Sequence, residues 1–85
     1  MTVKVIIFPI DNSFHVLVAG SWTDFPVRVR SFDDRTTMLA FLENLRLIDP
    51  EDAQKLEDFE FMSFCPMFSA EIDEEMLEAH GFSKP

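Results

Sequence analysis

The sequence lacks most of the residues from which disulfides and nucleotide sites are built. Its 85 residues contain one cysteine, two glycines and no tyrosine. A single cysteine, Cys65, excludes an internal disulfide and is typical of a reducing compartment, so we expect a cytoplasmic protein. Two glycines are too few for a glycine-rich phosphate-binding loop.

Long apolar segments are also missing. The N-terminal run Val5–Ile7 is too short for the apolar part of a signal peptide. Nothing approaches the about 20 apolar residues that a membrane-spanning helix requires. We therefore expect no contact with a membrane.

Bases are scarce, and the acids are concentrated in the second part of the chain. The protein has 16 acids against 7 bases and a net charge of −9. Residues 31–85 hold all but two of the acids, whereas residues 1–30 carry a small positive charge. Such a charge repels nucleic acids and anionic membranes and attracts basic proteins. The expected partner is another protein, a basic one being favoured by this charge, and direct nucleic-acid binding is disfavoured.

The first 32 residues have the pattern of an antiparallel meander. Strands are predicted over Val3–Ile10, Phe14–Ala19 and Pro26–Phe32 because β-branched and apolar residues recur there. Asp11–Ser13 has the composition of a hairpin turn. Strands joined by such short links pair in antiparallel fashion.

The first two strands are apolar on both faces. Val3, Val5 and Ile7 alternate with Ile6, Phe8 and Ile10. A sheet with one wet face does not have this pattern, so later chain or a second copy should cover the second face. A homodimer is therefore a possible state. On the third strand, Arg28 and Arg30 share one face and are expected to offset the charge of nearby acidic helices.

Two helices are predicted next. Ser31, Asp33 and Asp34 are alternative N-caps for the first. Its apolar stripe is formed by Met38, Phe41, Leu42, Leu45 and Ile48. The second begins with Asp49 as cap and Pro50 at the first helical position, and buries Ala53 and Leu56.

The remaining chain predicts a short strand and a last helix. Phe59–Phe64 alternates and predicts a fourth strand, which Cys65-Pro66 should interrupt. Asp73 is a plausible cap, and Gly81 suits a left-handed C-terminal residue with Phe82 returning to Leu77. The whole chain thus forms one α+β domain.

The predicted order of elements is loosely similar to the small sheet-and-helix domain of HicB-like antitoxins over about the first 48 residues. The likeness is one of topology. Gly20–Pro26 (GSWTDFP) replaces the Pro-Asp-Leu-Pro-Gly type of segment expected between the second and third strands. The resemblance therefore carries over no functional residue.

No arrangement of residues predicts catalysis, a metal site or a cofactor. Cys65 lies between Phe64 and Pro66, and an apolar setting makes a thiol inert. His15 is expected as an ordinary strand residue, and His80 suits the C-terminal end of a helix dipole. The acidic runs lack the spacing of zinc or calcium ligands. We expect a protein that is not an enzyme.

Two features are candidate interaction surfaces. One is the dense acidic sequence, whose candidate residues are Asp49, Glu51, Asp52, Glu57, Asp58, Glu71, Asp73, Glu74, Glu75 and Glu78. The other is the apolar segment Phe59–Phe68, with candidates Phe61, Phe64, Met67 and Phe68. Core packing is the alternative for this segment. Trp22 is a lesser candidate, as an exposed anchor or a lid over the core.

Three functional hypotheses follow. The first is a non-enzymatic protein-interaction or regulatory module of the inhibitor, immunity or antitoxin kind. The second is an acidic mimic of nucleic acid that occupies a basic protein, which requires the carboxylates to form one continuous face. The third is an enzyme or small-ligand carrier with a pocket near His15, Trp22 or Cys65.

Overall fold

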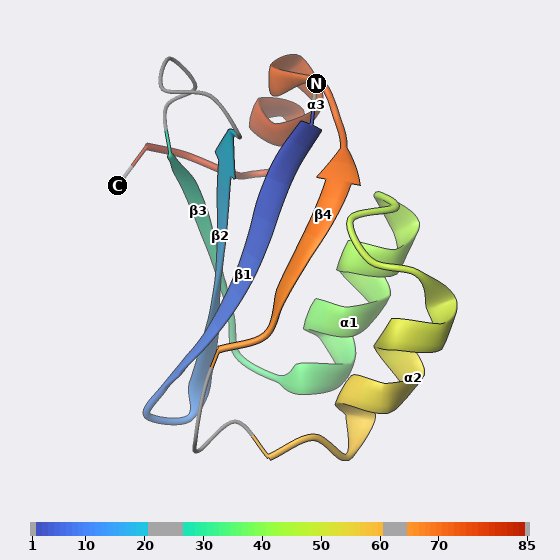
Figure 1. Ribbon diagram of the computed structural model, residues 1–85. Coiled ribbons are helices and arrows are strands. Elements are labelled where there is room, and N and C mark those ends of the chain that lie inside the picture. The colour runs from blue at the N-terminus through green and yellow to red at the C-terminus, as the bar shows by residue number, and fades with distance from the viewer. Residues whose placement is uncertain (1, 21–26, 61–64, 85) are drawn as a thin grey trace.

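A computed structural model describes residues 2–20, 27–60 and 65–84 of the chain. They form an α+β fold with a four-stranded antiparallel sheet in the order β3-β2-β1-β4. The strands are β1 (Thr2–Ile10), β2 (Ser13–Gly20), β3 (Arg28–Phe32) and β4 (Met67–Glu71). Figure 1 shows β1 in the interior of the sheet, between β2 and β4.

The predicted meander of the first three strands is confirmed. Strand β1 ends at Ile10, and β2 begins only three residues later, at Ser13. Asp11 takes a left-handed backbone conformation, with φ of 55°. This conformation suits a tight hairpin turn, and Asp tolerates it better than most residues.

The fourth strand lies further along the chain than the sequence predicted. Phe59 and Glu60 are not in a strand, residues 61–64 lie outside the described part, and β4 spans Met67–Glu71. Pro66 precedes this strand, and its carbonyl accepts a hydrogen bond of 3.1 Å from the Ile7 amide. A proline suits the start of a strand because its missing N–H is not needed there. Cys65 and Pro66 themselves lie outside any strand, and the predicted strand position, before rather than after them, is what differs.

The helices are α1 (Arg35–Asn44), α2 (Pro50–Glu57) and α3 (Glu74–Ala79). Asp34 caps α1 by accepting a hydrogen bond of 2.7 Å from the Thr37 amide, which selects one of the three predicted caps. Asp49 and Pro50 begin α2 as predicted. Within the described residues, no helix is long and apolar enough to cross a membrane.

Helix α3 ends in the predicted Schellman motif. The Phe82 amide donates to the Leu77 carbonyl at 3.0 Å, and the Gly81 amide donates to the Glu78 carbonyl at 3.2 Å. Gly81 has φ of 87°, a conformation that a residue without Cβ adopts readily. The motif returns Phe82 to the core, where it is 2% exposed.

All three helices pack on one face of the sheet. The buried residues of this face and of the helices form one hydrophobic cluster, which contains Val3, Val5, Ile7, Val16, Val18, Met38, Leu42, Leu56, Leu77 and Phe82. In Figure 1, α1 and α2 lie together beside the sheet, and α3 lies at its other end. The opposite face of the sheet has no helix over it among the described residues.

Candidate functional site: the open sheet face and the groove beside β4

The open face of the sheet carries an apolar row across all four strands. Ile6 lies opposite Met67 of β4 on one side and opposite Leu17 of β2 on the other. Leu17 lies in turn opposite Val29 of β3. We call Met67, Ile6, Leu17 and Val29 the apolar row. Side chains opposite one another in antiparallel strands are in contact, so this row is continuous.

Other side chains of this face flank the row. Phe8 and Ile10 continue it along β1, and Ile10 is 52% exposed. His15 shares a hydrogen bond of 2.7 Å between its Nδ1 and the Ser31 hydroxyl. His15 is thus a partnered strand residue, as the sequence predicted. The two-faced apolarity of β1 and β2 predicted that later chain or a second copy covers this face. Among the described residues, no later part of the chain does so.

The two edges of the sheet differ. The edge of β3 is paired, because Val29 and Ser83 exchange amide-to-carbonyl hydrogen bonds of 2.8 and 3.1 Å. On β4, the bond from Ile7 to Pro66 sets the alternation of the ladder. Phe68 and Ala70 therefore direct their main-chain groups to β1, and Met67 and Ser69 direct theirs outward. No described residue pairs with these outward groups.

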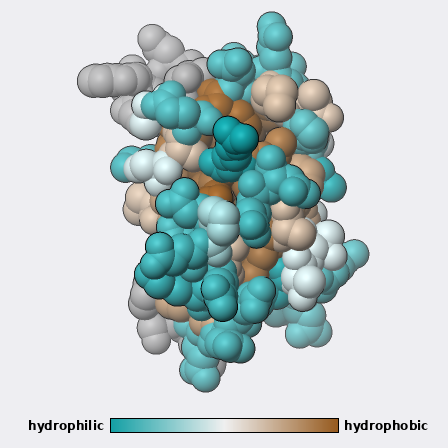
Figure 2. Space-filling model, turned by 90° about the vertical axis from the view of Figure 1, so that its right-hand side faces the viewer, coloured by the Kyte–Doolittle hydropathy of each residue, from teal (hydrophilic) through white to brown (hydrophobic). Residues whose placement is uncertain are grey.

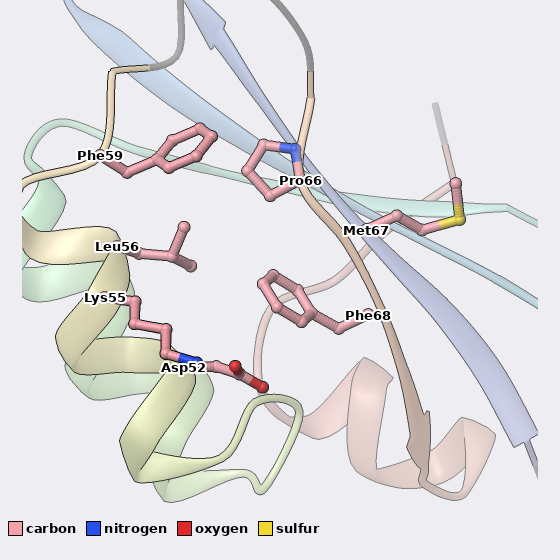
Figure 3. A pocket seen from close by; sticks show the side chains of 7 residues that line it. All are labelled: Asp52, Lys55, Leu56, Phe59, Pro66, Met67 and Phe68. Atoms are coloured by element: carbon pink, nitrogen blue, oxygen red, sulfur yellow. The ribbon is translucent and has the colours of Figure 1, made fainter.

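A series of three hollows lies beside this unpaired edge. Its first hollow, of about 290 Å³, is lined by Asp52, Lys55, Leu56, Phe59, Pro66, Met67 and Phe68. Figure 3 shows Phe68 pointing toward α2 and Met67 pointing away from it, so the hollow lies between the strand and the helix. Asp52 and Lys55 supply the polar side chains of its rim.

Two further hollows follow, one along the strand and one beyond its last residue, Glu71. One, of about 310 Å³, is lined by Thr2, Arg46, Asp49, Ser69, Ala70 and Glu71, and the next, of about 370 Å³, by Leu45, Arg46, Glu71, Ile72, Asp73 and Met76. We call the three hollows together the β4 groove. Figure 2 shows the side of the molecule on which α2 and β4 lie, where apolar side chains appear between largely hydrophilic ones.

The β4 groove has more acids than bases. Asp49, Asp52, Glu71 and Asp73 line it, against Arg46 and Lys55. The Thr2 hydroxyl donates a hydrogen bond to the Glu71 carboxylate and thereby holds the pKa of Glu71 below its usual value. Glu71 is thus held in its charged form at the strand's C-terminal end.

The predicted acidic residues are distributed over several elements. Asp49, Glu51, Asp52, Glu57 and Asp58 lie on or beside α2, and Asp73, Glu74, Glu75 and Glu78 on or beside α3. Arg28, which is 3% exposed, forms ion pairs with both Glu74 and Glu78. Arg28 thus offsets acidic charge, as predicted, and these two acids are less available to a partner than the rest.

Arg30 stabilises the same end of the fold. Its guanidinium lies 4.2 Å from the centre of the Phe41 ring and donates a hydrogen bond to the His80 carbonyl. Cation–π contact and helix-end bonding both favour a charged side chain here. The cations of β3 are therefore structural and leave no basic patch on this strand.

The described residues of the apolar segment Phe59–Phe68 differ in how far their side chains are exposed. Phe59 and Phe68 are half-buried and line the groove, whereas Met67 is 58% exposed on the open face. Phe61, Phe64 and Trp22 lie outside the described residues. Core packing and surface exposure thus both occur within this segment.

In the part of the chain that the structure describes, candidate metal-binding groups do not gather. Over residues 2–20, 27–60 and 65–84, no cluster of three His, Cys, Asp or Glu side chains is placed to hold a metal ion. Cys65 is a half-buried free thiol. Sequence reasoning missed the association of Arg46 and Asp49 with β4, and no local pattern could have revealed it because the strand follows some 20 residues later.

No family of proteins, curated protein or solved structure matches this chain.

Proposed function

We propose that the protein is a non-enzymatic protein-binding module that self-associates through the open face of its sheet. The observation that supports this proposal is the apolar row, which joins four strands without a charged side chain. Apolar side chains gathered on one surface favour association with another protein surface. The expected occupant of the face is a second copy of the chain.

Charge favours this occupant. The acids lie mainly on the helices, on the far side of the sheet from the apolar row. Two copies that meet through their sheets keep these helices on the outside, separated by both sheets, which themselves pack about 10 Å apart. At physiological salt the charges are screened over about 8 Å, so this contact brings little repulsion.

The size of the face limits the affinity. Nine residues of β1 extend about 30 Å, and four strands at about 4.8 Å spacing span some 15–19 Å. Two such faces bury on the order of 1,000 Å² together, near the lower limit for a specific interface. We therefore expect a dimer that dissociates on dilution.

The test is sedimentation equilibrium over a wide range of protein concentration. Leu17→Lys places a charge in the middle of the row, and Gln54→Lys adds the same charge to exposed helix α2 as a control. Wild type and Gln54→Lys should dimerise with increasing concentration, and Leu17→Lys should remain monomeric. Ile10→Lys, at an exposed position, should weaken the dimer without loss of packing. A wild type that is monomeric at millimolar concentration overturns the proposal.

A further inference from the structure

We propose that the β4 groove binds an extended segment of a basic partner, which adds to the sheet as a fifth strand beside β4. The inference rests on the proposed protein-binding function and names the chemistry of a partner at a second surface. Three observations on different parts of the groove support it.

The first observation concerns the main chain. Met67 and Ser69 present N–H and C=O groups outward, whereas the opposite edge of the sheet is occupied by Ser83. An unpaired strand edge is a template for an added strand, whose main-chain hydrogen bonds supply affinity without regard to sequence. Within residues 2–20, 27–60 and 65–84, the chain thus occupies one edge and leaves the other available.

The second observation concerns the side chains of an added strand. In such a strand, alternate side chains point to opposite faces. Those on the helical side would enter the hollow of about 290 Å³ lined by Leu56, Phe59 and Phe68, and would suit apolar groups. Those on the other side would lie beside Met67, which is 58% exposed, and can be basic, because a lysine covers apolar surface with its stem and keeps its charged end in water. Apolar residues are therefore expected at alternate positions of the ligand.

The third observation is electrostatic. Four acids and two bases line the groove, and the whole chain carries a net charge of −9. An approaching segment experiences attraction if it is basic and repulsion if it is acidic. The same argument disfavours the β4 strand of a second copy, which would bring two acidic grooves together.

The probe is a synthetic peptide, acetyl-Lys-Leu-Lys-Val-Lys-Leu-Lys-Val-amide, measured by fluorescence anisotropy. Two control peptides separate the contributions. One replaces every lysine with glutamate, and the other carries N-methyl groups on alternate amides, which remove donors to β4. Both control peptides should bind at least about tenfold more weakly. Equal binding of the N-methylated peptide would exclude strand addition.

Variants of the protein locate the site. Asp52→Lys should weaken peptide binding by about three- to tenfold, and Glu51→Lys, in the same helical turn but outside the groove, by less than about twofold. Ser69→Pro removes an outward amide and should abolish binding. If Ser69→Pro does not fold, the N-methylated peptide tests the same hydrogen bonds with the unchanged protein.

The dimer proposal and the proposal for the β4 groove can be tested independently of each other. Leu17→Lys should bind the peptide with wild-type affinity although it no longer dimerises. Dimerisation without peptide binding overturns the groove proposal alone, and peptide binding by a monomeric wild type overturns the dimer alone. If Asp52→Lys strengthens self-association of the protein, the groove holds a second copy, and the basic partner is excluded.

Discussion

Arg28 of β3 forms an ion pair with Glu78 of α3, with 2.8 Å between the Nη2 and Oε1 atoms, although the two side chains differ greatly in exposure. The Arg28 side chain is 4% exposed and that of Glu78 is 58% exposed. Glu74 also bonds to Arg28, and these carboxylates raise the pKa of the guanidinium, the Glu74 hydrogen bond first among the causes. The buried Arg28 cation therefore needs these carboxylates to compensate its charge, whereas the exposed carboxylates can also be solvated by water.

This asymmetry predicts unequal effects on stability. Removing both acids, in Glu74→Ala/Glu78→Ala, leaves a buried cation without a counter-charge and should lower the urea midpoint markedly. Arg28→Met removes the charge and keeps most of the volume, so it should have a smaller effect, because the exposed carboxylates are then solvated. Adding Arg28→Met to the double variant should restore part of the loss. Urea unfolding at neutral pH measures all three.

The control is Glu75→Ala, an exposed acid of the same helix, which should change the midpoint little. If Arg28→Met loses as much stability as the double variant, the ion pair itself stabilises the fold, and the asymmetry is not the explanation.

Gly81 should tolerate few substitutions. At φ of 87°, Gly81→Ala costs about 1–2 kcal/mol of unfolding free energy. A Cβ atom there would also lie 3.1 Å from Nη1 of Arg30, which is held against Phe41. Gly81→Asn should lose less because asparagine adopts the left-handed conformation more easily. Chemical denaturation measures the difference, and Ala79→Ser, at an exposed neighbour, should stay within about 0.5 kcal/mol of wild type. Equal losses for alanine and asparagine would show that the Arg30 contact matters more than the backbone.

Asp34 should make stability fall with acid. The Thr37 amide and hydroxyl donate to its carboxylate and lower the pKa of Asp34 in the folded protein. A group whose folded pKa is depressed stabilises the protein above its unfolded value, about 3.9, and loses that contribution as pH falls through the folded pKa. Asp34→Asn still offers a capping oxygen but takes up no proton. Its unfolding free energy should fall less steeply than that of wild type from about pH 5 to pH 3.

Asp33→Asn is the matched control because Asp33 is exposed and does not cap the helix. Urea unfolding at several pH values compares the slopes. The same slope in both variants would mean that the cap is not responsible for the acid dependence.

Much of the local structure followed from the sequence. Asp49 and Asp73 occupy the predicted N-cap positions without a side-chain capping hydrogen bond, and the proline of α2 and the glycine after α3 also lie at the predicted helix ends. The faces of β3 also followed, because alternation alone places Arg28 and Arg30 together. These features depend on residues a few positions apart, whose chemistry is visible in the printed chain.

The position of β4 did not follow, because two local signals competed. Phe59–Phe64 alternates more clearly than Met67–Glu71, and Pro66 resembles a break. Pairing with β1 decided the outcome, since Val5 lies opposite Phe68 and Val3 opposite Ala70 on the buried face. A strand is stabilised by its neighbour's hydrogen bonds and side chains, and its own sequence does not contain this information.

The sequence by itself therefore determined the fold class, the start of α2, both ends of α3, the two-faced apolarity of the first strands and the acidic character of the surface, whereas α1 ends at Asn44, before Leu45 and Ile48 of its predicted apolar stripe. Only the tertiary structure decided that all helices pack on one face, that Ser83 pairs with one edge of the sheet, and that α2 lies along the other. The physical reason is the distance along the chain between the residues that interact. Caps and alternation act between near neighbours, whereas the open face and the β4 groove arise from contacts between segments that are far apart in the chain.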